Sequence, residues 1–166
     1  MLTVKNNSNV ILTNLQISEF VLKAFSEIKS NPDINALIHF HFVNKFLLMA
    51  HAPGDTRTLG NIVANHDLLS LDVMLKKYEE YLRDVLKVEP SIKSHANVLQ
   101  KILGYYKKEL TKEEKSKLFK ALSDYRLGML SLNDVLLSLE EITGQFQKTY
   151  LVRQTYFLLY ARVAKP

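Results

Sequence analysis

Apolar residues recur at helical spacing along almost the whole chain, whereas the strict alternation of a half-buried strand is scarce. The first stripe falls at positions i, i+3, i+4, i+7, i+8 and i+11 and consists of Ile17, Phe20, Val21, Ala24, Phe25 and Ile28. A stripe of this kind is the buried face of an amphipathic helix. Because similar patterns return in the later segments, the sequence predicts an all-α fold.

Turn and capping residues divide the helical pattern into segments. Asn31 and Pro32 suit an N-cap and a first helical position. The stretch "TKEE" at 111–114 has the Thr-x-x-Glu form of a capping box, and Gly128 should end the helix that it opens. The first apolar stripe predicts one helix, and Ser131 is suited to cap another. We expect further helices over about 32–52, 56–65, 68–87, 91–110, 111–126 and 146–162. No linker suggests a second domain, so we predict a single domain over 1–166, an irregular bundle of about seven helices.

The composition excludes several kinds of protein. The chain has no uncharged apolar run of about 18 residues, and its N-terminus lacks the order of a secretory signal. There are no cysteines, which excludes disulfides, thiolate zinc sites and a cysteine nucleophile. The sequence also lacks a glycine-rich phosphate loop, a dinucleotide fingerprint and a His-Glu-x-x-His motif. We therefore expect a cytoplasmic protein without membrane contact, with no cofactor, no metal and no catalytic residues of its own.

The formal net charge is +5, and the charge is distributed unevenly along the chain. Residues 1–75 hold 5 basic and 6 acidic residues, whereas residues 76–166 hold 17 basic and 11 acidic residues. A basic half favours an anionic partner, with nucleic acid as the first candidate. The alternative is an ordinary solvated helical surface.

The stretch "HFHFVNKFLLMAH" at 39–51 combines a strongly apolar helix with several polar residues. On a helical wheel His41, Asn44, Lys45 and His51 fall on one strip. Burying an ammonium group without partners is costly, so Lys45 should reach a polar cleft or the surface. We interpret the strip as a candidate site, and the alternative is that it simply meets solvent.

The segment 91–110 predicts a helix with one apolar face and one basic face. The polar arc contains no acid and consists of Lys93, Asn97, Gln100, Lys101, Gly104, Lys107 and Lys108. Lysines on solvated helices usually pair with glutamates one turn away, so an arc without acids is suited to phosphate contacts. Gly104 in a helix interior costs about 1 kcal/mol relative to Ala. Close approach of a helix or of a ligand backbone would explain it.

Aromatic and amide side chains accompany the charge in the second half of the chain. They are Tyr105, Tyr106, Tyr125 beside Arg126, and Arg153, Gln154 and Tyr156. Tyrosine and arginine can stack on exposed bases while lysine holds the phosphates. Alternatively, most of these tyrosines lie at the edge of the core with the hydroxyl toward water.

Several separated motifs resemble one known family. "FHFVNKFLLMAH" (40–51) and "HANVLQKILGYYKKEL" (95–110) are similar to two stretches of the YbgA-like domain, a bacterial domain of unknown function. "YRLG" (125–128) and "YLVRQTY" (150–156) are similar to two of its shorter elements. Order and spacing agree over about 35–157, although the end, "YFLLYARVAKP", lacks the proline-rich finish of the family.

The family domain occurs alone or fused to a thiouracil-type or 4-thiouridine desulfidase domain, where it is the presumed tRNA-binding part. The resemblance therefore implies tRNA binding rather than chemistry. At the matching positions it implies a binding role for His41, Lys45, His51, His95, Asn97, Gln100, Tyr105, Tyr125, Arg126, Gln154 and Tyr156. A copy without the desulfidase would deliver tRNA to a separate desulfidase protein or serve another purpose.

The residues and the resemblance together predict a module that binds tRNA or another structured RNA. The complete predicted set adds Lys93, Lys101, Gly104, Lys108 and Arg153 to the residues implied by the resemblance. The alternative is a small enzyme acting on a nucleotide or another small anionic substrate, with His41, His51 or His95 as general base. Convergence of these histidines in one concave pocket would favour the enzyme. The sequence leaves the oligomeric state open.

Overall fold

The structure is a computed structural model that describes residues 12–145 and 154–160. Its elements are α1 (Asn14–Ser30), α2 (Ile34–His51), α3 (Pro53–Ala64), α4 (Leu71–Lys87), α5 (Ile92–Tyr105), α6 (Lys112–Arg126), α7 (Leu132–Gln145) and α9 (Thr155–Tyr160). Within these two ranges there is no strand, so the predicted all-α bundle is confirmed. None of the described helices has the length and apolar character needed to cross a membrane.

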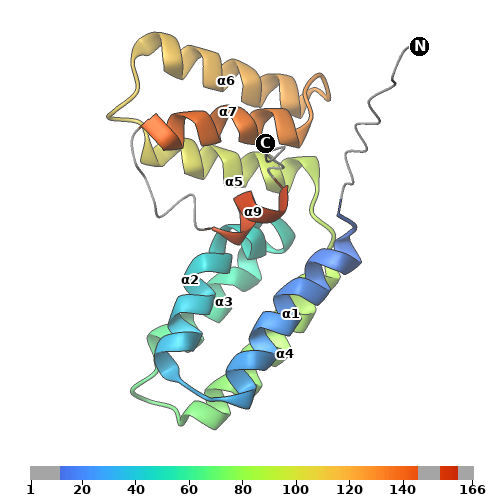
Figure 1. The fold of residues 1–166 in the computed structure, drawn as a ribbon, viewed down its shortest axis with the longest axis vertical. Helices are drawn as coiled ribbons and strands as arrows, with labels where there is room; N and C mark the ends of the chain where they lie inside the picture. Colours follow the sequence, from blue (N-terminus) through green and yellow to red (C-terminus); the bar gives the residue numbers. More distant parts are fainter. Residues whose placement is uncertain (1–11, 146–153, 161–166) are drawn as a thin grey trace, which may run out of the picture.

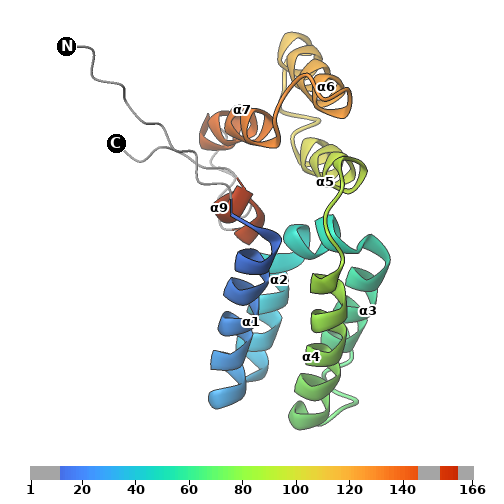
Figure 2. The same ribbon diagram turned by 90° about the vertical axis from the view of Figure 1, so that its right-hand side faces the viewer.

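The helices form two groups that meet at α2. Helices α1 to α4 lie side by side along the long axis of the molecule, and α5, α6 and α7 stack across one end (Figures 1 and 2). The short helix α9 lies at the junction, where it contacts α2 and α7. Helix α2 contacts α1, α3, α4, α5 and α9, so it is the central element of the fold.

The central position of α2 explains its composition. Five consecutive residues, 46–50, are buried although successive side chains point to different sides of a helix. A helical segment that is apolar on all sides, as residues 46–50 are, must be surrounded by other elements. The contacts of α2 with its neighbouring helices meet this requirement. Burial of each large apolar side chain, such as Leu47 and Leu48, contributes about 2 kcal/mol to the stability.

Local capping signals set several of the helix boundaries. The predicted capping box is present, because Glu114 donates its N–H to Thr111 Oγ1 at 3.2 Å and accepts the Thr111 N–H at 2.8 Å. Gly128 adopts the left-handed conformation, with φ of 75°, just after α6. The prediction that Asn31 caps α2 is wrong. Asp33 is the cap and accepts the N–H of Asn35 at 3.1 Å, so Pro32 precedes the helix.

The predicted helix over 91–110 is too long. Helix α5 ends at Tyr105, Tyr106 is its C-cap, and the chain continues in turns to 110. At the start of α5, Ser91 and Ser94 form a second capping box. In the predicted helix over 146–162, the described part is Gln154, which is not helical, followed by α9. The remainder of that prediction lies outside the described residues.

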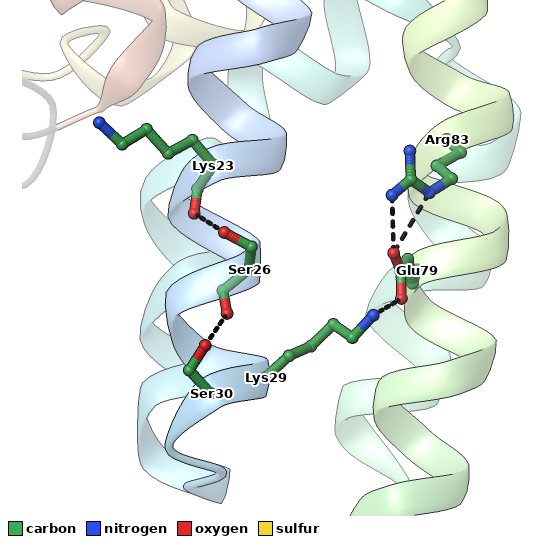
Figure 3. A network of polar contacts seen from close by, with 6 residues as sticks. All are labelled: Lys23, Ser26, Lys29, Ser30, Glu79 and Arg83. Carbon is green, nitrogen blue, oxygen red and sulfur yellow. Dashed lines mark hydrogen bonds and ion pairs between the residues drawn. The ribbon is translucent and has the colours of Figure 1, made fainter.

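An ion-pair network joins α1 to α4 in the first group of helices. Glu79 accepts hydrogen bonds from Lys29 at 2.5 Å and from Arg83 Nη2 at 2.8 Å (Figure 3). These two cations hold the pKa of Glu79 below its ordinary value. On α1, the hydroxyls of Ser26 and Ser30 donate hydrogen bonds to main-chain carbonyls of the preceding turn, so both hydroxyls have partners within their own helix (Figure 3). The network therefore has a structural role.

Candidate functional site

A cleft of about 320 Å³ lies between α2 and α5, and we call it the α2–α5 cleft. It is lined by Lys45, Phe46, Met49, Lys101, Gly104 and Tyr105. Four of these residues, Lys45, Lys101, Gly104 and Tyr105, belong to the set predicted from the sequence. The structure thus brings together residues from two segments that are more than fifty positions apart in the chain.

The α2–α5 cleft combines cations with an aromatic wall. Lys45 and Lys101 are both exposed, one on each helix. The ring of Tyr105 is 45% exposed and meets the buried ring of Phe46 edge to face, with centroids 6.1 Å apart. Ammonium groups beside an exposed aromatic ring are suited to a nucleotide, because they can hold its phosphate while the base stacks on the ring.

Gly104 lies in the last turn of α5, not in the helix interior as the sequence suggested. Among the described residues, a Cβ built at this position meets no atom within 4 Å outside its own turn of the helix. No described helix therefore approaches Gly104 closely. Of the two explanations given by the sequence, this leaves the close approach of a ligand backbone.

A second depression, of about 240 Å³, lies between α5 and α6 on the other side of Gly104. We call it the α5–α6 hollow, and it is lined by Gln100, Leu103, Gly104, Lys107, Leu110, Lys115, Leu118 and Phe119. Leu103, Leu110 and Leu118 are buried and form an apolar floor. Gln100 accepts a hydrogen bond from Arg126 Nη2 at 3.0 Å, so two further predicted residues lie together next to the hollow.

The polar face predicted for 91–110 is exposed. Lys93, Asn97, Lys107 and Lys108 all face solvent, whereas the opposite face of α5 is in the core. Of the ion pairs formed by residues 12–145 and 154–160, none includes a lysine of this face or Lys45. The basic face is therefore free of acidic partners in the described part of the chain.

His41 lies at the contact of α2 with α3 and α4 and does not line the α2–α5 cleft. Its Nδ1 forms a 2.9 Å hydrogen bond with the hydroxyl of Tyr78, and its Nε2 lies 3.4 Å from a Cβ built at Gly60. Burial, and to a smaller extent the positive charge of Lys45, lower the pKa of His41. His41 is thus a neutral packing residue at neutral pH.

His51 and His95 are buried near one another. The Nδ1–H of His51 donates to the carbonyl of Val88 at 2.7 Å, and His51 Nε2 has no partner among the described residues. The Nδ1 of His95 is 2.8 Å from the hydroxyl of Tyr156. Burial, and then the charge of His51, lower the pKa of His95 to about 4. Because His41 and His51 are ten residues apart on α2, or about 15 Å along its axis, the three histidines do not converge.

Five predicted binding residues lie inside the fold: His51, His95, Tyr125, Gln154 and Tyr156. The side chain of Gln154 donates to the carbonyl of Phe42 at 2.7 Å and accepts from the N–H of Phe46 at 3.5 Å. These residues offer no surface to a macromolecule in this structure, and their partners are other parts of the chain. Arg153, which was also predicted, lies outside the described residues.

The sequence interpretation did not include seven lining residues of the two depressions. Five are apolar: Phe46 and Met49 form the floor of the α2–α5 cleft, and Leu103, Leu110 and Leu118 form that of the α5–α6 hollow. The other two, Lys115 and Phe119, come from α6, in which the sequence analysis considered the capping box and the pair Tyr125 and Arg126. The available signal was an apolar residue within the lysine-rich stretch "KEEKSKLFK", since Phe119 is 56% exposed there.

Comparison with known proteins gives a family without an assigned activity. A family model described as "Protein of unknown function (DUF1722)" matches residues 45–161. The chain is 28% identical over 129 residues to "Uncharacterized protein YbgA" of Escherichia coli strain K12, over 77% of this chain and 76% of that protein. No solved structure matches the chain significantly. The match to a family of YbgA-like domains agrees with the resemblance seen in the sequence.

Proposed function

This chain belongs to the DUF1722 family, and we propose that it is an RNA-binding module whose ligand is tRNA or another structured RNA. The observation that carries the proposal is the exposed face of α5, whose lysines have no acidic partner in the described part of the chain. This face adjoins the α2–α5 cleft, to which α2 contributes Lys45.

Electrostatics supports a polyanionic ligand. Lys93 and Lys101 of α5 and Lys108 in the turns that follow it are all exposed, and the chain as a whole carries a net charge of +5. Unpaired lysines release counterions from a phosphate backbone when they bind it, which is the main source of affinity in such complexes. The exposed ring of Tyr105 adds a surface on which a base can stack. Unpaired bases can use this surface, whereas the bases of a duplex are already stacked on each other.

The choice of tRNA comes from the resemblance to domains that are fused to a 4-thiouridine desulfidase. The chain has no cysteine with which to carry out desulfurisation in the way of a cysteine-rich enzyme. We therefore propose an accessory role, in which this chain binds tRNA in the cytoplasm and a separate tRNA-modifying or desulfurising enzyme performs the chemistry.

A salt series tests the proposed function. Purified protein is titrated with total tRNA and with double-stranded DNA of equal length, and the dissociation constant is measured at several salt concentrations. We expect micromolar or tighter tRNA binding, preferred over DNA. The logarithm of the binding constant should fall linearly with the logarithm of the salt concentration, and each phosphate contact should add roughly 0.7–0.9 to the magnitude of this slope. Absence of tRNA binding at low salt would refute the proposal.

A charge reversal locates the binding face. The triple variant Lys93→Glu/Lys101→Glu/Lys108→Glu should abolish tRNA binding and leave the circular dichroism spectrum unchanged, because these side chains are exposed. The matched control is Lys23→Glu/Lys76→Glu/Lys77→Glu, which changes the net charge equally on exposed positions of α1 and α4. Equal loss in both variants would show that net charge alone, and not this face, determines binding.

The alternative of an enzyme with a histidine general base has less support from the geometry. Neither the α2–α5 cleft nor the α5–α6 hollow is lined by a histidine. His51 and His95 are buried, and His41 is engaged with Tyr78. The unpartnered Nε2 of His51 favours this alternative, but that atom is enclosed in the core.

A further inference from the structure

We propose that the α2–α5 cleft and the α5–α6 hollow bind two neighbouring unpaired nucleotides of one RNA strand, which crosses α5 over Gly104. This assignment rests on the proposed function and narrows it, because it names single-stranded RNA as the recognised element. Gly104 lines both depressions and is the residue that they share.

The open space at Gly104 provides the crossing point. Outside its own turn of the helix, a Cβ at this position would meet no atom of the described residues within 4 Å, so packing in that part of the chain does not require glycine. Gly104 is exposed, and its φ is not in the left-handed region, so no turn requires glycine either. Any larger side chain would instead extend into the space between the two depressions. Glycine is therefore the residue that keeps a path open from one depression to the other.

The two depressions have the same chemistry, although their residues come from different helices. Each combines an exposed aromatic ring with two lysines: Tyr105 with Lys45 and Lys101, and Phe119 with Lys107 and Lys115. An aromatic ring accepts the face of any base, and lysines hold the phosphates on either side of it. Bases in a duplex are stacked on each other and do not expose their faces, so this pairing of rings and lysines fits a single strand.

The size of the depressions fits one base in each. Their volumes are about 320 and about 240 Å³, so the first lies at the lower end of the roughly 300–1,000 Å³ range of sites for small molecules and the second lies below it. Two small sites on either side of a glycine are suited to consecutive bases, whereas one large site would favour a free ligand. Since stacking dominates, we expect little preference for base sequence.

Binding of short labelled RNA tests this inference. A single strand of about eight nucleotides, within the ~4–16 nucleotide range of single-strand sites, is compared by fluorescence anisotropy with a blunt-ended duplex of the same strand and its complement, which has no unpaired base. We expect the single strand to bind at least about tenfold more tightly than the duplex and to compete with tRNA. A free nucleoside monophosphate should bind far more weakly than the strand, and equal affinity would overturn the inference in favour of a small-ligand site.

Variants of the two rings and of the crossing point complete the test. Tyr105→Ala and Phe119→Ala should each weaken single-strand binding about fivefold or more, and Tyr105→Phe should retain it. Tyr81→Ala is the matched control, because Tyr81 is also a surface aromatic, 42% exposed, but lies on α4. Gly104→Leu should block the crossing and weaken binding of the single strand about tenfold, whereas Gly104→Ala should have an intermediate effect.

The possible failures are distinguishable. If wild-type protein binds tRNA but the ring variants bind the single strand normally, this inference is wrong and the proposed function stands. If tRNA does not bind at all, the proposed function itself fails. If Gly104→Leu loses helical circular dichroism, the ring variants, which alter exposed side chains, still decide the outcome.

Discussion

The Nδ1 of His95 on α5 lies 2.8 Å from the hydroxyl of Tyr156 on α9, a residue 61 positions further along the chain. Both side chains are buried, and burial raises the pKa of Tyr156 well above its ordinary value, so its hydroxyl stays protonated. The ring of Tyr160 packs against His95 with centroids 4.9 Å apart. This contact joins α9 to the helix that carries the basic face, and it therefore contributes to the stability of the fold.

Tyr156→Phe should destabilise the protein without changing RNA binding. The substitution keeps the ring and removes the hydroxyl, so His95 Nδ1 loses its partner in the interior. An unsatisfied buried polar group costs about 1–3 kcal/mol, which corresponds to a fall in Tm of roughly 2–10 °C for a domain of this size. Urea denaturation measures the change, and Tyr81→Phe, at an exposed position, serves as the control. An unchanged midpoint would show that His95 finds another partner.

The stability should fall as the pH is lowered from about 6.5 to about 4. His95 has a pKa of about 4 in the folded state, mainly because of burial, against an ordinary value of 6.5. Between these values the unfolded chain binds a proton that the folded chain does not. The free energy of unfolding therefore falls as the pH is lowered through this window, and the full contribution of His95 is present above it. The contribution of His95 is about 3 kcal/mol, and His51, with a lowered pKa, acts in the same direction.

Urea denaturation between pH 7.5 and pH 4 checks this dependence. Glu79 titrates below its ordinary pKa of 4.5 and therefore contributes mainly below the window. His95→Gln removes the titrating group and should flatten much of the curve, at some cost in stability at neutral pH. A wild-type curve that is level from pH 6.5 to pH 4.5 would contradict the assignment of a buried neutral histidine.

The features that the sequence predicted correctly depend on residues close together in the chain. The capping box of Thr111 and Glu114 needs only four consecutive positions, and its two hydrogen bonds are present. The two faces of α5 follow from helical periodicity, because the period alone decides that Lys93 and Lys101 share one side.

The features that the sequence did not predict depend on distant partners. On α2, the polar strip was interpreted as one site, but of its four residues Lys45 is the one that lines the α2–α5 cleft. His41 and His51 each find a partner 37 positions away, and Gln154 contacts Phe42 from 112 positions away. Which of these polar groups is buried is decided by the helices that surround α2. A single helical wheel contains no information about those neighbours.

Gln154→Leu should loosen the attachment of α9 to α2. The side chain of Gln154 is fully buried, and its amide donates to the carbonyl of Phe42 at 2.7 Å. Leucine has a similar volume but cannot make this bond, so we expect a loss of about 1–3 kcal/mol in the free energy of unfolding. Hydrogen exchange should show faster opening of residues 154–160 before global unfolding. Gln100→Leu, at an exposed position, is the control and should leave exchange in α9 unchanged.

Removing the two cations of the α2–α5 cleft should lower both the affinity for tRNA and its dependence on salt. Lys45 and Lys101 are exposed and form no ion pair with the described residues, so Lys45→Ala/Lys101→Ala should leave the stability nearly unchanged. If each lysine contacts one phosphate, the slope of log affinity against log salt should decrease in magnitude by roughly 1.4–1.8. The control, Lys76→Ala/Lys77→Ala, removes two exposed lysines from α4 and should preserve the slope. A variant of the cleft that keeps the wild-type slope would show that these two lysines do not contact phosphates, and would leave Lys93, Lys107 and Lys108 to explain any binding.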